Sequence, residues 1–523
     1  MSANANGVAA PEPHPWLVAV SVMFGTFMVV LDTTVVNVSL PHIAGNLNAS
    51  VEESTWALTS YLAANAIILP ITGWLSTLIG RRRLLLLSVA SFTAASFLCG
   101  LAISLPMLIL CRVAQGATGG VMQPLSQAVM LEAFPPKERG NAMALFSIGI
   151  VVAPILGPVL GGWLTDSYSW RWVFFINVPV GILAVIMVRA FVHDPAYLKR
   201  GFMRIDYWGI GLLAVGIGAL QIGLDKGQEE DWFESNFITI LIAVAAVTLT
   251  LFILHELVVR DPVVYLRAFR ERSFAAGTIL VTLMSVGLFG SLVMLPVLLQ
   301  TLMGYSPVTA GWAMMPRGLG SLVSTPIVGM LLARRDPRKI LVTGVILCGF
   351  TMLWLSWLNL DAGFWDLFWP QFFQGVAFGM LFVPLATTSM DAISREEMGN
   401  ATSLFNLMRN IGGSIGIAAV QTIIARDRQV HTAILGANVD PFGRQTQIAF
   451  TNLRSAFMAS GSDFVTATQR AYMALFGMVQ KQAAITAFLD AFRSIALVFA
   501  VMVPLVFLLR RPRHQNRGAM AGE

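Results

Sequence analysis

Charged residues are scarce in this chain. Asp, Glu, Lys and Arg account for 12% of its 523 residues, whereas 56% of the residues are hydrophobic. An ordinary soluble domain carries about 25% charged residues, so most of this chain is suited to lipid rather than water. The composition effectively excludes a soluble protein.

Several motifs of energy coupling and metal chemistry are absent from the sequence. No Gly-x-x-x-x-Gly-Lys-[Ser/Thr] loop is present, which argues against an ATP-driven pump. Only six histidines occur, without a His-Glu-x-x-His motif or a His/Cys cluster, which argues against a metalloenzyme. Cys99, Cys111 and Cys348 lie in apolar runs without Cys-x-x-Cys spacing, so neither a zinc site nor a disulfide framework is indicated. We expect no enzymatic activity, no cofactor and no metal.

The sequence contains many long runs of apolar residues. A run of about 20 apolar residues can cross a bilayer as a helix. Spans are expected near residues 16–40, 54–76, 84–104, 106–131, 140–164, 172–193, 206–225, 236–258, 274–300, 307–333, 340–359, 366–391, 399–424 and 488–509. The predicted fold class is an all-α integral membrane protein with about fourteen transmembrane helices.

The connections between these spans alternate in charge. Lys and Arg gather in every second connection, for example at 81–83, 199–204 and 334–339, and the others carry mostly acidic residues. By the positive-inside rule, the basic connections and both termini face the cytoplasm. The net charge of +6 comes largely from these segments, so it indicates topology rather than nucleic-acid binding. The first fifteen residues hold no Lys or Arg and no cleavage site follows, so the first helix is expected to stay in the membrane.

Asp32 is the most informative residue, because it lies inside the apolar run from Trp16 to Leu40. A carboxylate in that setting is costly and is normally functional. It lies about 24 Å into its helix, and Arg112, which enters from the opposite side, is expected at a similar depth. Such a pair could load and release a proton as a cavity opens to each side. A permanent structural ion pair is the alternative.

The sequence also contains an internal repeat. Gln115-Gly116 recurs as Gln374-Gly375, and residues 140–146 recur as 399–405, in both cases 259 positions further on. A weaker match at an offset of 256 links Trp56, Pro70 and Gly73 with Trp312, Pro326 and Gly329. Parallel repeats of this kind build transporters whose halves rock around a midplane cavity. The expected units are a cytoplasmic tail at 1–15, a six-helix bundle at 16–204, two additional helices at 205–260, a second six-helix bundle at 261–510 with an extracytoplasmic loop at about 425–487, and a cytoplasmic tail at 511–523.

Four sequence motifs resemble those of a known family. The segment 31–38 is similar to a first-span signature, Arg112 to Gly116 to a fourth-span motif, 73–83 to the loop motif after the second span, and 149–162 to the antiporter motif of the fifth span. Together they make essentially the whole chain resemble the major facilitator superfamily, and most closely its fourteen-helix, EmrB-type multidrug exporters. The resemblance implies a proton-coupled antiporter that exports hydrophobic drugs or toxic compounds across a bacterial inner membrane by alternating access.

The same resemblance assigns roles to these motifs. It links Arg112 to proton coupling beside Asp32, and it indicates export rather than import. In the loop motif Thr77 stands where most members have an aspartate, which puts a charge-relay gate there in doubt. The small-xxx-small spacing of the fifth span is expected to give a tight, kinked contact between the halves, although generic helix packing is the alternative. The expected antiporter-motif residues are Gly149, Pro154, Gly157, Pro158, Gly161 and Gly162, and those of the loop gate are Gly73, Gly80, Arg81 and Arg82.

Two further cations lie near the middle of apolar spans. Arg317 and Arg409 are each about 15 Å from a helix end, and neither can face lipid cheaply. Without a carboxylate beside them in the sequence they favour weakly acidic hydrophobic compounds, including uncouplers, over purely cationic substrates. The residues expected to line a substrate cavity are Asn37, Gln115, Met122, Gln123, Gln127, Arg317, Phe378, Met380, Asn406 and Arg409.

The long extracytoplasmic segment between about 425 and 487 is mostly polar, with apolar residues at helical spacing in 451–458 and 465–482. It is expected to form amphipathic helices. The resemblance implies that this segment docks a periplasmic adaptor, which in turn meets an outer-membrane channel; a self-packed cap without a partner is the alternative. An importer, an exporter of a specific metabolite, siderophore or lipid, and a membrane sensor that moves nothing also remain open from the sequence.

Overall fold

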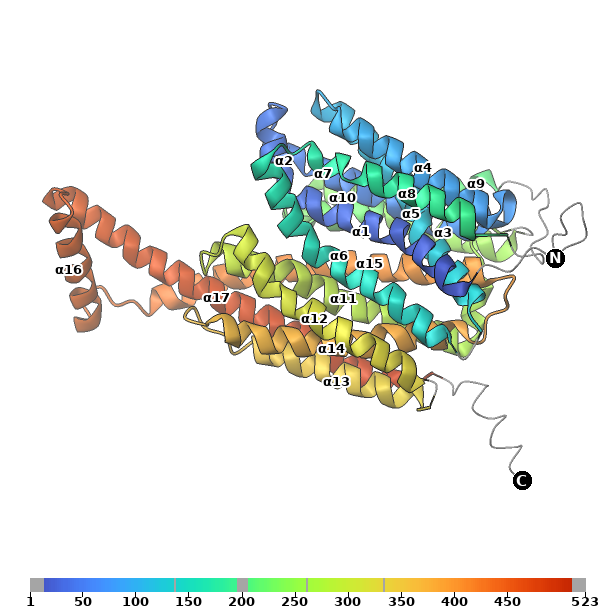
Figure 1. The fold of residues 1–523 in the computed structure, drawn as a ribbon. Coiled ribbons are helices and arrows are strands. Elements are labelled where there is room, and N and C mark those ends of the chain that lie inside the picture. Colours follow the sequence, from blue (N-terminus) through green and yellow to red (C-terminus); the bar gives the residue numbers. More distant parts are fainter. Residues whose placement is uncertain (1–13, 136–137, 195–205, 260–261, 333, 510–523) are drawn as a thin grey trace, which may run out of the picture.

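The computed structural model describes residues 14–135, 138–194, 206–259, 262–332 and 334–509. Within those ranges every regular element is a helix, which confirms the predicted all-α fold class (Figure 1). The elements are α1 (Pro15–Asn46), α2 (Val51–Ser54), α3 (Trp56–Ile79), α4 (Arg81–Gly100), α5 (Leu105–Ala133), α6 (Arg139–Ser167), α7 (Trp172–Phe175), α8 (Asn177–Phe191), α9 (Tyr207–Lys226), η1 (Trp232–Glu234), α10 (Asn236–Val258), η2 (Leu266–Arg270), α11 (Arg272–Thr301), α12 (Pro307–Leu332), α13 (Pro337–Leu355), α14 (Phe364–Met390), α15 (Met398–Ala437), α16 (Arg444–Ala459) and α17 (Phe464–Val506).

Most of these helices are long and apolar enough to cross a membrane. Among the described residues, 12 helical segments meet that standard by length and composition. Two more long helices, α6 with 29 residues and α12 with 26, occupy the places of the fifth and tenth expected spans. The chain is thus a multi-pass membrane protein, and the count of fourteen spans stays a prediction.

The helices of each sequence half pack mainly among themselves. In the first half α5 packs against α1, α3 and α4, and α8 packs against α1 and α4; in the second half α14 packs against α11, α12 and α13, and α17 against α11, α13 and α15. The halves meet where α6 packs on α12 and α14, and where α15 packs on α3 and α5. The paired helices α9 and α10 lie beside this seam, because α9 contacts both α3 and α15.

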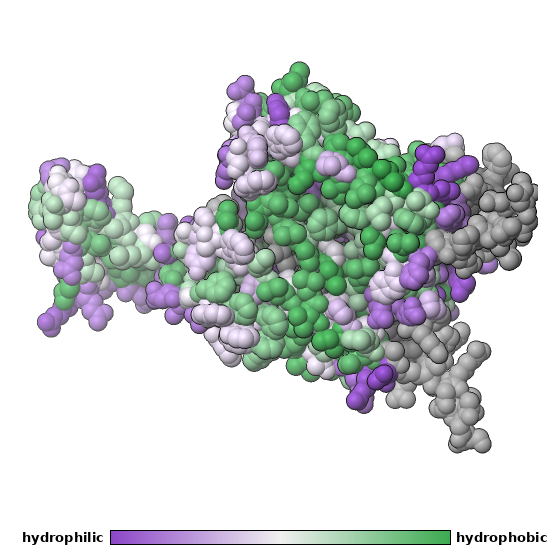
Figure 2. Space-filling view, in the orientation of Figure 1, coloured by the Kyte–Doolittle hydropathy of each residue, from purple (hydrophilic) through white to green (hydrophobic). Residues whose placement is uncertain are grey.

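An apolar belt covers the face of the bundle that is seen in Figure 2. Figure 2 shows hydrophobic residues over its middle and polar residues towards its two ends. At one end of the bundle lie the start of α4, at Arg81 to Arg83, and the starts of α6, α11 and α13. Each of these four helices begins with or near an arginine, and we call this end the basic end. At the other end α15 and α17 continue beyond the bundle, and with α16 they form a projection that we call the arm (Figure 1).

The arm differs from the sequence-based expectation in one respect. The apolar runs end near residue 424 and begin again near 488, yet α15 continues to Ala437 and α17 starts at Phe464. The expected loop is therefore largely an extension of two membrane helices, because its polar residues keep a helical pattern. The amphipathic segments at 451–458 and 465–482 lie within α16 and α17, as expected.

Equivalent glycines bring equivalent helices into contact in the two halves. A Cβ atom added to Gly116 of α5 would overlap the backbone carbonyl of Tyr61 in α3, and one added to Gly375 of α14 would overlap that of Arg317 in α12. The repeat seen in the sequence therefore corresponds to the same backbone approach in space.

We expect Gly116→Ala to destabilise the protein. The methyl group would push α3 away from α5, and overpacking of this kind typically costs about 1–3 kcal/mol. The measurement is the midpoint of thermal unfolding in detergent. Gly45→Ala in α1 is the matched control, since nothing lies within 4 Å of its added Cβ; it should leave the midpoint unchanged or raise it slightly through better helix propensity. An equal effect of both changes would contradict the proposed contact.

Candidate functional site

Asp32 and Arg112 form an ion pair in the interior of the first half. The Arg112 Nη1 atom donates to Asp32 Oδ2 at 2.5 Å, and both side chains are fully buried. Arg112 also donates through Nε to the backbone carbonyl of Ala57 at 3.0 Å. The sequence-based expectation that the two residues share a depth agrees with this contact, which joins the middle of α1 to the first third of α5.

Two amides complete the surroundings of the carboxylate. The Asp32 Oδ1 atom accepts hydrogen bonds from Gln115 Nε2 at 2.9 Å and from Asn177 Nδ2 at 2.8 Å. Gln115 in turn accepts from Arg112 Nη1 at 2.8 Å, and Asn177 also donates to Ser96 Oγ at 3.1 Å. Both carboxylate oxygens are thus bonded to donors, the condition under which a buried charge is tolerated.

Aromatic rings cover the guanidinium. The Arg112 Cζ atom lies 4.1 Å from the centre of the Tyr61 ring and 5.8 Å from that of Phe174. Apolar side chains such as Val35 and Val36 enclose the cluster further. The ion pair is therefore inside the first bundle and out of contact with water in this conformation.

A second polar group joins the two halves. Arg409 of α15 donates from Nη2 to Gln123 Oε1 of α5 at 2.5 Å, and Asn406 donates from Nδ2 to Gln127 Oε1 at 2.6 Å. The Arg409 guanidinium also lies 5.9 Å from the ring of Phe382. We call Gln123, Gln127, Asn406 and Arg409 the inter-half clasp. These four expected cavity residues are brought together by the fold.

The other expected cavity residues lie elsewhere. Gln115 belongs to the Asp32 cluster, and Arg317 is buried inside the second half, where its Nε donates to Gln371 Oε1 at 2.8 Å. The remaining four residues lie at separate places. Met122 is buried near Gly25 of α1, and Met380 packs near Gly344 of α13. Phe378 is buried within the second half and stacks on Phe382, whereas Asn37 is exposed.

The antiporter-motif glycines pack α6 against α1 of the same half. Added Cβ atoms on Gly157 and Gly161 would meet Thr34 and Val35, respectively, and one on Gly149 would meet Met23. Gly162 has no neighbour within 4 Å, and the side chains of Pro154 and Pro158 lie outside the described residues. The tight glycine contact is therefore within the first half, while α6 also packs on α12 of the second.

The expected loop gate ties several helices at the basic end. Gly80 has a φ of +93°, a left-handed conformation that suits glycine and separates α3 from α4. Arg81 forms a buried ion pair with Glu132 at the end of α5. The Arg82 amide donates to Asp194 Oδ1 at 2.8 Å, and its Nη2 donates to the Arg189 carbonyl at 2.5 Å.

Gly73 of the same motif makes a contact between the halves. Its added Cβ would lie 2.6 Å from the Cα atom of Asn400, and the equivalent Gly329 lies against Gly140 and Asn141. Both contacts are at the basic end, where the two halves are thus in close contact.

Five residues of these contacts are not evident as site residues from the sequence: Asn177, Ser96, Tyr61, Glu132 and Asn400. A polar residue within an apolar span was the signal available for Asn177 and Ser96. The importance of Tyr61 and Asn400 depends on which helix faces are in contact, which one sequence does not reveal.

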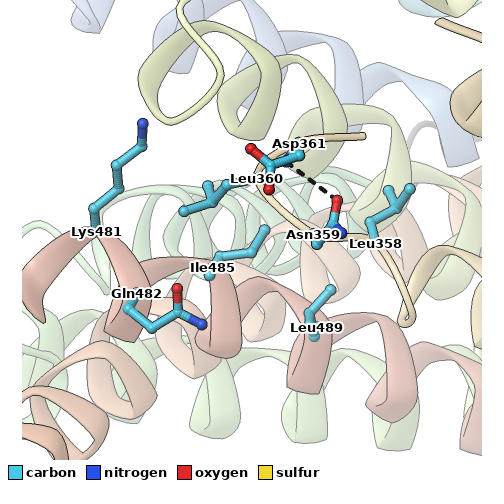
Figure 3. A pocket seen from close by; sticks show the side chains of 8 residues that line it. All are labelled: Leu358, Asn359, Leu360, Asp361, Lys481, Gln482, Ile485 and Leu489. Atoms are coloured by element: carbon cyan, nitrogen blue, oxygen red, sulfur yellow. Dashed lines mark hydrogen bonds between the residues drawn. The ribbon is translucent and has the colours of Figure 1, made fainter. Parts of the chain in front are cut away.

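A surface pocket of about 380 Å³ lies at the base of the arm, away from both polar groups. The connection at 358–361 lines one side of it, and Lys481, Gln482, Ile485 and Leu489 of α17 line the other (Figure 3). Asn359 Oδ1 accepts a hydrogen bond from the Asp361 amide at 3.1 Å. The pocket contains neither Asp32 nor a residue of the inter-half clasp, so we assign the pocket no part in transport.

Comparisons with known proteins agree with this architecture. The model of the Major Facilitator Superfamily matches residues 22–417. The chain is 37% identical over 499 residues to the multidrug export protein EmrB of Escherichia coli K12, covering 95% of each chain. It is 35% identical to the fatty acid resistance protein FarB of Neisseria gonorrhoeae, covering 96% of this chain and 97% of that one. The EmrB protein of Haemophilus influenzae is 40% identical over 432 residues, which are 82% of this chain and 84% of that one.

A solved structure supports the fold. The human organic anion transporter MFSD10 aligns with a TM-score of 0.60 over 95% of this chain and 100% of its own, at 13% sequence identity. At that identity the likeness concerns the fold alone. With a family model over most of its length and relatives of this similarity, the chain belongs to the major facilitator superfamily, among the EmrB-type multidrug exporters.

Proposed function

We propose that this transporter exports hydrophobic compounds from the cytoplasm in exchange for protons, with Asp32 as the residue that carries the proton. The observation that supports this best is the buried Asp32–Arg112 pair, a titratable group inside a membrane bundle. The proposal includes a bacterial inner membrane as the location, which fits the EmrB relatives, and an orientation with the basic end and both termini in the cytoplasm, which the positive-inside rule supports.

The proton step follows from the contacts of Asp32. Arg112, Gln115 and Asn177 donate hydrogen bonds to both oxygens of the carboxylate. When the halves move and the cluster loosens, water reaches Asp32 and the carboxylate can take up a proton, while Arg112 keeps its contacts with the Ala57 carbonyl and the Tyr61 ring. A gradient of one pH unit supplies about 1.4 kcal/mol per proton, and 100 mV adds about 2.3 kcal/mol per charge.

We expect Asp32→Asn to abolish transport driven by a pH gradient in liposomes. Asparagine keeps the shape of the side chain but carries no titratable proton. Exchange of labelled for unlabelled substrate without a gradient should persist, since that reaction needs no net proton transfer. The measurement is the flux of a fluorescent hydrophobic compound and of a weak-acid uncoupler with and without the gradient.

The matched control is Asp166→Asn at the end of α6, outside the Asp32 cluster. Gradient-driven flux that survives Asp32→Asn would refute the proton-carrying role. Loss of exchange together with loss of the gradient response, accompanied by a lower unfolding midpoint, would indicate that the ion pair is structural.

The inter-half clasp supports a substrate class that includes weak acids. The Arg409 Nη1 atom is buried and makes no hydrogen bond within the described part of the chain, so it is a donor suited to a carboxylate or phenolate. The neighbouring Phe382 ring stacks on Phe146 of α6 at 6.3 Å between ring centres and offers an apolar surface for the rest of the molecule. The name of the relative FarB, a fatty acid resistance protein, is consistent with an amphipathic acid as substrate.

We expect Arg409→Gln to weaken export of acidic substrates selectively. A hydrogen bond to a charged group contributes about 1.5–3 kcal/mol, so the half-saturating concentration of a weak acid should rise about tenfold or more. That of a neutral hydrophobic compound should change little. Arg428→Gln, on an exposed part of α15, is the control. Equal losses for acidic and neutral compounds would argue for a role in gating instead.

The arm supports a partner protein outside the membrane. It extends well beyond the apolar belt, and α16 is fixed to α17 by the Phe450–Tyr472 ring contact at 4.4 Å (Figure 1). Large apolar side chains remain exposed on α17, including Met473 at 70% and Phe476 at 56%. Exposed apolar groups of this kind mark interaction surfaces. The partner is a periplasmic adaptor, which would connect the exporter to an outer-membrane channel.

We expect the double change Met473→Ser and Phe476→Ser to abolish copurification with the adaptor while leaving flux in liposomes unaltered. Polar side chains remove the apolar contact but not the helix. Gln469→Ser, also exposed on α17, is the control. If the double variant retained the adaptor, the docking surface would have to lie elsewhere; if it lost liposome flux as well, the arm would belong to the transport machinery.

A further inference from the structure

Arg317 lies in the interior of the second half with most of its hydrogen-bonding capacity unused. Its exposed fraction is 2%. Nε donates to Gln371, but Nη1 and Nη2 make no hydrogen bond with any described residue. The Gln371 Nε2 atom, on the adjacent amide, is also buried and without an acceptor among those residues. Unsatisfied donors thus gather around one buried positive charge.

The helices around Arg317 supply no carboxylate for it. The sequences of α11 to α15 and α17 contain three acidic residues, Asp366, Asp427 and Asp490. Asp366 is exposed in the first turn of α14 and accepts from the Gly363 amide. Asp427 lies in the part of α15 that leads into the arm, and Asp490 binds His431 and Arg493. Burial of a cation without a counter-charge is strongly unfavourable.

The repeat shows what the other half has at the same place. Offsets of 259 and 256 pair Asp32 with Ser291, Arg112 with Gln371, Gln115 with Gln374, and Tyr61 with Arg317. The hydrogen bond from Gln115 to Asp32 has its counterpart in that from Gln374 Nε2 to Ser291 Oγ at 3.2 Å. The second half therefore has its cation, Arg317, at the position of Tyr61 and an amide, Gln371, at the position of Arg112, while a neutral serine stands where the first half has its carboxylate.

We propose that a single small monovalent anion, chloride under cellular conditions, binds beside Arg317 and supplies the negative charge that Asp32 supplies in the first half. Arg317 Nη1 and Nη2 and the Gln371 amide are its donors. Gln374, which follows Gln371 by one helical turn, lines a small and mainly apolar cavity that contains neither Arg317 nor Gln371. The enclosed setting favours a halide over an organic acid or a divalent anion. This inference does not depend on which compounds the protein exports or on proton coupling.

The test compares unfolding midpoints of the full-length protein in detergent with chloride, bromide or gluconate at constant ionic strength. Wild type should unfold at a higher temperature in chloride and bromide than in gluconate. Binding to the folded state alone shifts the unfolding equilibrium about tenfold when the chloride concentration is ten times its dissociation constant. Arg317→Gln should lose the response to chloride.

Two substitutions at Ser291 keep the test decisive if Arg317→Gln fails to fold. Ser291→Asp places a carboxylate at the position equivalent to Asp32, so it should make stability independent of chloride. Ser291→Asn is similar in size but neutral and should keep the chloride response, as should Arg409→Gln, which removes the other midplane cation.

Equal midpoints in chloride and gluconate for wild type would overturn the proposal. A chloride response that persists in Ser291→Asp, or one that disappears in Arg409→Gln, would overturn it as well, because the ion would then lie elsewhere.

Discussion

The structure depends on one constraint, the high free energy of an unpartnered charge inside a membrane bundle. In the first half this constraint brings four helices to a single point, since Asp32 of α1 is bonded by Arg112 and Gln115 of α5 and by Asn177 of α8, while Arg112 also binds the backbone of α3. None of these groups can leave without exposing another to a dry interior. The cluster therefore fixes the relative positions of the helices around it, and any movement that hydrates Asp32 must change several contacts together.

Close backbone contact holds the helices of each half together around such clusters. Gly116 and Gly375 bring α5 onto α3 and α14 onto α12 at equivalent points, and Gly73 and Gly329 bring the halves together at the basic end. The glycines within each half lie beside its buried polar group, whereas those at the basic end lie between the halves. Helix contacts formed by small residues suit both purposes, because their surfaces are smooth and their approach is set by the backbone.

The sequence predicted the features that arise because burying a polar or charged side chain in lipid costs free energy. Asp32, Arg112, Arg317 and Arg409 stood out because each interrupts an apolar run, and the repeat predicted two related halves. It did not predict which face of a helix meets which neighbour. Met122 and Gln123 are adjacent in sequence, yet Met122 packs inside the first half and Gln123 contacts Arg409 of the second. Asn177 interrupts an apolar span in the same way, but the sequence does not show that its side chain meets Asp32 of another helix. The sequence predicted amphipathic helices in the arm but not that they continue α15 and α17, because the apolar runs end where these helices reach the edge of the lipid while the helical pattern goes on.

The distribution of charge makes the two halves chemically unequal despite their common backbone. In the first half a carboxylate and a guanidinium lie together, and this is the pair to which we assign proton transfer. In the second half Arg317 and Arg409 lie deep in the bundle without a carboxylate, so its six long helices offer positive charge but no comparable proton carrier. A transport cycle built on these residues would divide its tasks, with protonation in the first half and recognition of negative groups in or beside the second.

Helix α5 links the two halves. Arg112 and Gln115 bind Asp32 near one end of α5, and Gln123 and Gln127, further along the same helix, bind residues of the second half. A shift of α5 that loosens Asp32 would therefore also disturb the inter-half clasp, which gives a physical route for coupling proton uptake to the opening of the halves.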